Sequence, residues 1–184
     1  MENNSTIVLS MGDRQVISGS NDYGQLGLGH THQMTGFEAL PFRVDQIMPF
    51  HYSTEFNVFL SGGQLLFTGL VTAPTVLSGL LPGFSKDDDC LTATPLRFPE
   101  SARAFCCYDN KLIWVSEGRT HVSHTMADGP GRTFTVPFEV VAVADSAPIR
   151  LRHASGQWFS ADMAECDVPV AWATITPVSV DAWV

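Results

Sequence analysis

The chain has 184 residues, of which 45% are hydrophobic and 16% are charged, and its formal net charge is −9 at pH 7. This length suits one domain with a substantial core or one short repeat array, and it excludes two large domains. The negative charge disfavours direct binding to nucleic acid and to anionic membrane surfaces. The low charged fraction predicts that much surface is buried, part of it against another chain.

The N-terminal segment predicts a β-hairpin. Residues 5–10, STIVLS, form a short apolar run, residues 11–14 read Met-Gly-Asp-Arg, and residues 15–18 begin a second run with two β-branched residues. The first residues contain neither a basic segment nor an apolar leader. We therefore expect an intracellular protein, in the cytoplasm or the nucleus.

A glycine-rich turn follows this hairpin. In the sequence GSNDYGQLGLG, which begins at residue 19, glycines alternate with leucines, so a tightly coiled backbone still sends two apolar side chains inward. A phosphate-binding loop is the alternative interpretation, but its glycine order is wrong for a dinucleotide site and no helix is expected after it. We therefore assign a structural turn to Gly19, Asn21, Gly24, Gln25, Gly27 and Gly29.

Residues 15–44 resemble a known repeat. A strand, the pattern Gly-x-Asn-x-x-Gly-Gln-Leu-Gly-x-Gly from residue 19, and a downstream Pro-x-x-Val are similar to the repeat of the regulator of chromosome condensation family. The resemblance implies a β-propeller. It also implies, as an alternative function, nucleotide exchange on a small GTPase, although no exchange residue of that family can be transferred to this chain.

Two series of signals recur along the chain. Hairpin strands begin at residues 15, 64, 111 and 157, spaced 49, 47 and 46 residues apart. Pro-x-x-apolar anchors begin at residues 41, 95, 137 and 177, and we expect each proline to be the first residue of a strand. Periods of about 40 to 50 residues built from short strands are typical of propeller blades. We predict one all-β domain over residues 1–184, a small or partial propeller of about four blades. Its units cover about residues 1–40, 41–90, 91–136 and 137–176, with a closing strand at 177–184.

The phase of the repeats suggests how the arc ends. The chain begins with the late strands of a unit and finishes with the early strands of another, so we expect residues 171–184 to complete one blade with residues 6–18. The N- and C-terminal strands would then share one sheet. Four units either close into a small ring or form an arc that another chain completes.

An uncharged stretch covers residues 65–84. A membrane span is one alternative, but two prolines and three glycines interrupt it, and its first part aligns with a strand of the repeat. We interpret it as a buried strand followed by an apolar loop that a partner covers. The candidate interaction surface consists of Leu70, Val71, Leu77, Leu80, Leu81 and Phe84.

The sequence offers few groups for chemistry. Its four cysteines lack a CxxC pair, so free thiols are expected, and His121 with His124 is a weak zinc alternative because residues three apart on a strand point to opposite faces. GxSxG, HExxH and P-loop motifs are absent from the sequence. We predict no catalysis, cofactor or metal. The preferred hypothesis is a non-enzymatic protein–protein interaction scaffold, an obligate subunit of a larger complex whose partners are other protein subunits.

Overall fold

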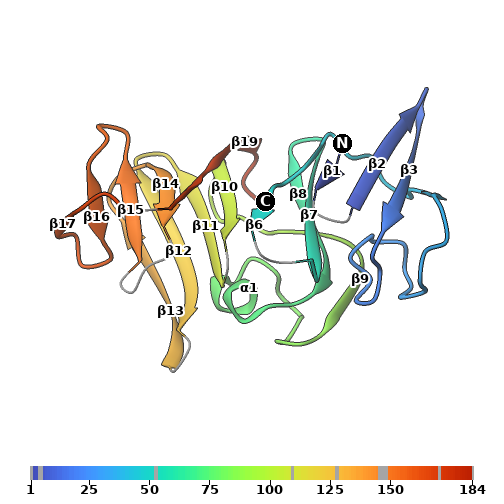
Figure 1. The fold of residues 1–184 in the computed structure, drawn as a ribbon, viewed down its shortest axis with the longest axis horizontal. Coiled ribbons are helices and arrows are strands. Elements are labelled where there is room, and N and C mark those ends of the chain that lie inside the picture. Colours follow the sequence, from blue (N-terminus) through green and yellow to red (C-terminus); the bar gives the residue numbers. More distant parts are fainter. Residues whose placement is uncertain are drawn as a thin grey trace.

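The structure is a computed structural model that describes residues 2–3, 6–51, 54–108, 110–126, 129–144, 149–169 and 171–183. These residues form nineteen strands and one short helix, and the strands assemble into four mainly antiparallel sheets. The sheets follow one another across the molecule in chain order, from the N-terminal hairpin at one end to β17 at the other (Figure 1). The chain therefore adopts an all-β, propeller-like fold whose sheets correspond to blades.

The first sheet contains the expected hairpin. Its strands, in spatial order, are β1 (Glu2–Asn3), β2 (Thr6–Met11), β3 (Arg14–Gly19) and β4 (Glu38–Ala39). Gly12 adopts a φ of 66° in the turn between β2 and β3, a backbone conformation that glycine accepts without strain. The register places Val8 opposite Ile17, and both side chains are buried. The hairpin prediction is confirmed.

The second sheet repeats this arrangement. Its strands, in spatial order, are β5 (Gln46–Ile47), β7 (Phe56–Ser61), β8 (Gln64–Leu70) and β9 (Asp89–Pro95). Helix α1 (Ala73–Ser78) lies in the connection between β8 and β9 and ends at Gly79, which has a left-handed φ of 71°. The uncharged stretch, residues 65–84, thus contains most of the buried strand β8 and then the six-residue helix α1.

The third sheet is the largest and collects strands from three parts of the chain. Its strands, in spatial order, are β13 (Gly129–Val136), β12 (Arg119–Met126), β11 (Lys111–Ser116), β10 (Ala102–Tyr108) and β19 (Thr176–Val180), and β6 (Phe50–His51) also pairs with β10. The open edge of β10 is shared: β19 pairs along residues 102–105, and β6 pairs along residues 107–108. The C-terminal segment is therefore part of the middle of the molecule.

The fourth sheet closes the far end of the row. Its strands, in spatial order, are β17 (Glu165–Cys166), β16 (Trp158–Ser160), β15 (Arg150–His153), β14 (Val140–Ala144) and β18 (Ala173–Thr174). Strand β18 pairs with β14, directly before the chain continues into β19 in the third sheet. Residues 173–180 thus join the two neighbouring sheets through main-chain hydrogen bonds.

Apolar side chains fill the space between each pair of neighbouring sheets. Val8 and Ile17 from the first sheet pack with Phe59 and Leu66 from the second. The second and third sheets enclose the largest cluster, and the third and fourth enclose another that includes Ile113. Facing sheets that bury alternate residues of each strand are the packing expected between propeller blades.

The prediction that the terminal strands share one sheet is wrong. Strand β19 pairs antiparallel with β10, whereas β2 and β3 lie in the first sheet. Val178 and Val180 of β19 are buried in the cluster between the second and third sheets, so their apolar pattern is satisfied there. An alternating apolar pattern predicts that a segment pairs with the edge of some sheet, but it does not identify the partner strand.

The proline anchors and one hairpin also differ from expectation. Pro95 is the last residue of β9 rather than the first residue of a strand, and Pro41 and Pro137 lie in connections. The long hairpin of β12 and β13 is a further difference, although the Thr, Val and Phe residues within both segments are typical of strands. The repeats therefore have similar strand orders, but the proline anchors do not occupy equivalent places in them.

We predict that β19 is required for stability. Val180→Asp places a carboxylate in the cluster between the second and third sheets and should lower the free energy of unfolding by more than about 2 kcal/mol, because a buried polar group without a partner is costly. Ser179→Asp is the matched control, since Ser179 is the adjacent residue and is exposed. Thermal unfolding followed by circular dichroism distinguishes them, and equal midpoints for the two variants would contradict the placement of β19.

Candidate functional site

The glycine-rich turn after β3 has the backbone conformation that only glycine accepts readily. Gly24, Gly27 and Gly29 have φ values of 73°, 71° and 85°. The amide of Gly24 donates to the carbonyl of Asn21, and that of Gly29 donates to the carbonyl of Leu91 in β9. These N–H groups are satisfied inside the protein, so they do not form an open cradle for a phosphate.

Two buried amide side chains hold this turn in place. The Asn21 side chain accepts from the amide of Leu26 at 3.1 Å and donates to the carbonyl of His30 at 2.8 Å. The Gln25 side chain donates to the carbonyl of Thr54, which precedes β7, at 2.9 Å. The carbonyl of Gln25 in turn accepts from the hydroxyl of Thr68 in β8. The turn thus links the first sheet to the second.

We predict that Gly27 is needed for this link. A Cβ at residue 27 would lie 2.8 Å from Cγ2 of Thr68 and 3.1 Å from Cε1 of Phe42, whereas a Cβ at Gly12 meets no atom within 4 Å. Both glycines have positive φ. Gly12→Ala should therefore cost about 1 to 2 kcal/mol through backbone strain alone, and Gly27→Ala should cost at least about 1 kcal/mol more because of overpacking.

Urea denaturation of the two variants measures this difference directly. A smaller loss of stability for Gly27→Ala than for Gly12→Ala would contradict the role of the turn as a packed link between sheets.

Most of the predicted interaction surface is internal, which corrects the sequence-based interpretation. Val71, Leu80 and Leu81 are buried in the cluster between the second and third sheets. Leu70 is half-buried, and Phe84 packs against the same cluster. The uncharged stretch is thus covered by this chain rather than by a partner.

Helix α1 accounts for this burial, because it packs on the third sheet. The hydroxyl of Ser123 in β12 donates to the carbonyl of Pro74 at 2.7 Å, and the hydroxyl of Thr133 in β13 donates to that of Leu77 at 3.2 Å. The side chain of Leu77 itself remains 42% exposed. Within the described part of the chain, no helix has the length and hydrophobicity needed to cross a membrane.

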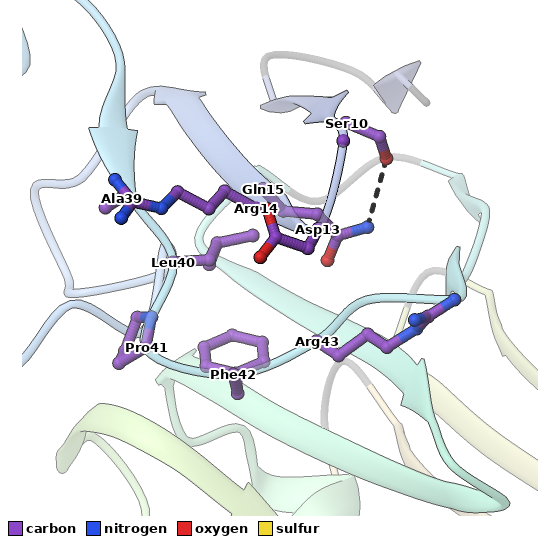
Figure 2. A pocket seen from close by; sticks show the side chains of 10 residues that line it. Ser10, Asp13, Arg14, Gln15, Ala39, Leu40, Pro41, Phe42 and Arg43 are labelled. Carbon is purple, nitrogen blue, oxygen red and sulfur yellow. Dashed lines mark hydrogen bonds between the residues drawn. The ribbon is translucent and has the colours of Figure 1, made fainter.

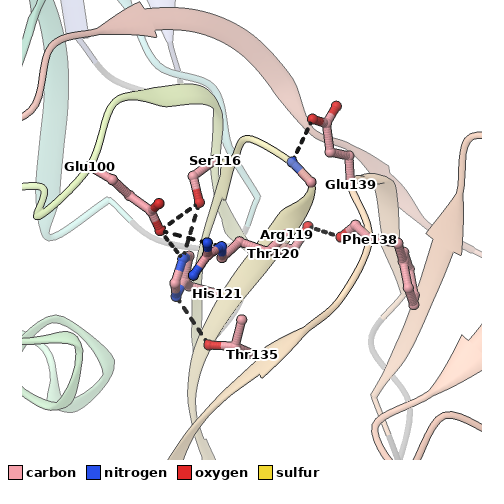
Figure 3. Close-up of polar contacts among 9 residues, drawn as sticks. Glu100, Ser116, Arg119, Thr120, His121, Thr135, Phe138 and Glu139 are labelled. Carbon is pink, nitrogen blue, oxygen red and sulfur yellow. Dashed lines mark hydrogen bonds and ion pairs between the residues drawn. The ribbon is translucent and has the colours of Figure 1, made fainter.

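A polar cluster lies on the third sheet, where the connection before β10 meets β11, β12 and β13 (Figure 3). Glu100 accepts from the hydroxyl of Ser116 at 2.9 Å, and its carboxylate lies 2.8 Å from Nε2 of His121. The His121 ring stacks on Trp114 with centroids 4.7 Å apart, and its Nδ1 lies 3.1 Å from the Thr135 hydroxyl. Every polar edge of this imidazole therefore has a protein partner.

The cluster does not have the geometry of a serine hydrolase. In a Ser-His-acid triad, the serine and the carboxylate contact different imidazole nitrogens. Here Ser116 and Glu100 both contact Nε2, and the two also contact each other. Thr135 occupies the other nitrogen from an exposed position on β13. We interpret the cluster as a set of hydrogen bonds that holds the connection between β9 and β10, which contains Glu100, against the third sheet.

These contacts of Glu100 make the free energy of unfolding fall at acid pH. The Ser116 hydroxyl holds the pKa of Glu100 below its ordinary value of 4.5, and contacts with His121 and Arg119 act in the same direction. A lowered carboxyl pKa contributes stability that is fully present above the unfolded value of about 4.5 and is lost as the pH falls through the folded value.

We therefore predict that Glu100→Gln lowers the melting temperature at pH 7, and that this effect becomes smaller as the pH falls through the folded pKa and the wild-type carboxyl is protonated in turn. Glu117→Gln is the control, because the Glu117 side chain is 85% exposed and its recorded ion pair among the described residues is with the exposed Arg103. Melting curves from pH 3 to pH 7 test this difference. A Glu100→Gln effect that is the same at both pH values would contradict the pH dependence.

Nucleophilic and metal-binding groups are not assembled elsewhere in the described residues. Burial raises the pKa of Cys106 to about 12 and that of Cys107 well above its ordinary value, so these thiols stay protonated at neutral pH. His121 stacks on Trp114, whereas His124 meets Phe134, so the two histidines use opposite faces of β12. No group of three His, Cys, Asp or Glu side chains in the described ranges is arranged to hold a metal ion.

A pocket of about 460 Å³ lies beside the first hairpin. Figure 2 shows Arg14 and Arg43 directed to opposite ends of it, with Asp13 between them, and Leu40 and Phe42 also line it. Gln15 fixes one wall, because its side chain both donates to the carbonyl of residue 44 and accepts from the amide of that residue. The pocket is an open, mixed polar and apolar depression rather than an enclosed ligand site.

The outer face of the first sheet carries exposed apolar residues that no described segment of the chain covers. Because Val8 and Ile17 point toward the second sheet, the alternate residues Leu9, Met11 and Val16 point away from it. Leu9 is 43% exposed and Met11 is 66% exposed. In Figure 1 this hairpin forms one end of the molecule.

The outer face of the fourth sheet is different. Ala142, Ala144 and Trp158 form a small buried cluster on it, and the ring of Trp172 packs edge-on against Trp158 with centroids 5.9 Å apart. The segment between β17 and β18 therefore covers this face. Among the described residues, one end of the row of sheets is covered by a segment of the chain itself, whereas the other end has no such cover.

Comparisons with known proteins show a similarity in fold. No family model and no curated protein matches this sequence. The crystal structure of human WBSCR16 is similar to this chain, with a TM-score of 0.54 and 14% sequence identity. The match covers 97% of this chain and 51% of that chain, so the chain spans about half the length of the solved protein. At this identity the similarity concerns the fold alone.

Proposed function

We propose that this protein is a non-enzymatic interaction module that is built into a larger complex, and that it docks through the outer face of its first sheet onto a β-sheet of another polypeptide. The observation that carries the proposal is the exposed apolar row of that face. Leu9 lies opposite Val16, and Val16 lies opposite Ala39, so three apolar side chains cross three strands at the same level. Met11 extends the row along β2.

The packing inside the molecule indicates what kind of partner fits this face. Each internal boundary is made by the apolar faces of two sheets, and the first sheet already uses one of its faces in this way. Its second face presents the same residue types at the same strand spacing. A further sheet that packs there would continue the existing row, and burying a Leu or Met side chain contributes about 1.5 to 3 kcal/mol.

The surroundings of the face supply a polar rim. Ala39 belongs both to the apolar row and to the lining of the pocket, and the exposed residues Arg14 and Arg43 line the same pocket. An apolar centre with a polar edge and arginine nearby is the usual composition of a protein interface. A partner with acidic residues at its margin would complement these two arginines.

The fold supports a binding function without identifying the partner. Repetitive β-folds present rigid faces and loops, and many of them act by binding other proteins. The similarity to about half of the human WBSCR16 structure supports the view that this arrangement of sheets can be continued by further sheets. We propose that in this protein the continuation comes from a separate subunit.

The test is co-purification of the full chain from cells of its source. Leu9→Glu combined with Met11→Glu should leave the fold intact, because both side chains are exposed, but should reduce recovery of stoichiometric partners at least about tenfold, since two charges would have to be desolvated in the interface. Val168→Glu is the control, because Val168 is also an exposed large apolar residue and lies away from this face.

Quantitative mass spectrometry of the recovered proteins gives the measurement, and circular dichroism checks the fold. Unchanged recovery with the double variant would contradict docking through this face. Partners that are lost equally with Val168→Glu would also contradict it.

A further inference from the structure

The outer edges of the four sheets are not equally protected. Strands β4 and β17 form the outer edges of the first and fourth sheets, and each has only two residues. Strand β9 forms the outer edge of the second sheet, and the glycine-rich turn covers it: Leu28 bridges to Thr92, and the amide of Gly29 donates to the carbonyl of Leu91. These three edges therefore offer little free backbone for pairing.

Strand β13 is the exception. It has eight residues, and in the described ranges its recorded strand pairing is with β12 alone. Figure 1 shows it at the outer rim, as part of a long hairpin that extends beyond the rest of the third sheet. Along such an edge every second residue directs its N–H and C=O away from the sheet, which makes the edge a template for another strand.

The side chains along β13 leave this edge accessible. Arg132, Thr133 and Thr135 are exposed, and the β-branched threonines suit an extended backbone. Pro130 has no N–H and cannot contribute a donor, so the usable part is residues 131–136. That length matches the most common strand length of about 5 to 6 residues.

One face of this edge offers an apolar contact. Gly131 lies against Leu77 of α1, so closely that a Cβ on residue 131 would meet Cδ1 of Leu77. Leu77 is held there by the hydrogen bond from Thr133 to its carbonyl, and its side chain remains exposed. A strand added beside β13 would place an alternate side chain next to Leu77, so an apolar residue fits that position.

The opposite face offers a charge and a ring. Alternation places Arg132 and Phe134 on the face opposite to Thr133 and Thr135, and the Phe134 ring packs edge-on against His124. Arg132 is exposed and contributes positive charge next to His124. An added strand would therefore be favoured by an acidic residue opposite Arg132 and an apolar residue opposite Phe134.

From these contacts we propose that β13 binds an extended peptide segment of another protein by strand addition, with an acidic residue opposite Arg132 and apolar residues beside Leu77 and Phe134. The main-chain hydrogen bonds of residues 131–136 supply affinity, and the alternating side chains supply selectivity. A second copy of this chain fits less well, because two molecules with a net charge of −9 repel each other. This site is separate from the outer face of the first sheet.

The test uses a fluorescein-labelled synthetic peptide of sequence Ser-Val-Thr-Ile-Leu-Glu-Thr-Ser, designed to pair antiparallel with residues 131–136. In that register its Glu lies opposite Arg132, its Leu lies beside Leu77 and its Ile lies opposite Phe134. We expect saturable binding to the full chain by fluorescence anisotropy and slower amide hydrogen exchange within residues 131–136. The amide of Thr125 bonds to the carbonyl of Asn110, so alternation directs the backbone groups of Thr133 and Thr135, and not those of Phe134, away from β12. A peptide with Pro in place of the Thr that lies opposite Thr135 is therefore the control and should bind at least about tenfold more weakly, since it lacks a ladder donor.

A charge exchange tests the register. Arg132→Glu should weaken binding of the Glu peptide about tenfold and strengthen binding of a peptide with Lys at that position, because like charges directly opposite are unfavourable. Leu77→Ser should weaken binding of both peptides. The Leu9→Glu, Met11→Glu variant should bind as the wild type does, which separates this site from the first-sheet face.

Three outcomes would overturn the proposal. They are the absence of saturable binding, protection from exchange that is confined to other segments, and a chain that becomes dimeric in sedimentation and loses peptide binding as it does so, which would assign the β13 edge to self-association.

Discussion

Face-to-face packing of neighbouring sheets is the interaction on which the rest of this structure depends. Each sheet has four to six short strands, and a sheet with an apolar face must bury that face against another layer. Here Ile17, Phe67 and Ile113 are each completely buried because a second sheet covers them. The glycine-rich turn and helix α1 serve the same packing, since the first links two sheets and the second lies against the next one. A face that lacks a neighbouring sheet is therefore the feature that needs an explanation.

Local signals made the strands and the first turn predictable. Val16 and Ile17 with the Gly12 turn specify a hairpin through residues close in sequence, and the register agrees. The placement of β19 could not be derived in this way, because Val178 and Val180 would satisfy any open apolar edge and their partner strand lies more than seventy residues earlier. The burial of Val71, Leu80 and Leu81 inside this chain could not be predicted either. An uncharged segment has the same sequence pattern whether its own chain or a partner covers it.

Buried polar side chains, like the apolar ones, hold separate segments of the chain together. Asn21 and Gln25 are buried, and their amides bond to main-chain groups of segments that must meet. Glu100, Ser116 and His121 similarly connect a loop to a sheet through one shared set of contacts. These side chains could be recognised in sequence as unusual, but their hydrogen-bond partners come from distant strands. Their roles therefore become visible only with the fold.

The position of β19 also constrains how the chain is made by the ribosome. Residues 102–108 emerge early, but most of the free edge of β10 is filled only when residues 176–180 have left the exit tunnel, and β14 waits in the same way for residues 173–174. During elongation, Phe105 therefore belongs to a sheet whose edge is still open. Non-local pairing of this kind slows folding and leaves strand edges exposed to misassembly. The third and fourth sheets thus become complete together, after residues 173–180 have been translated, and until then their open edges are available for incorrect pairing.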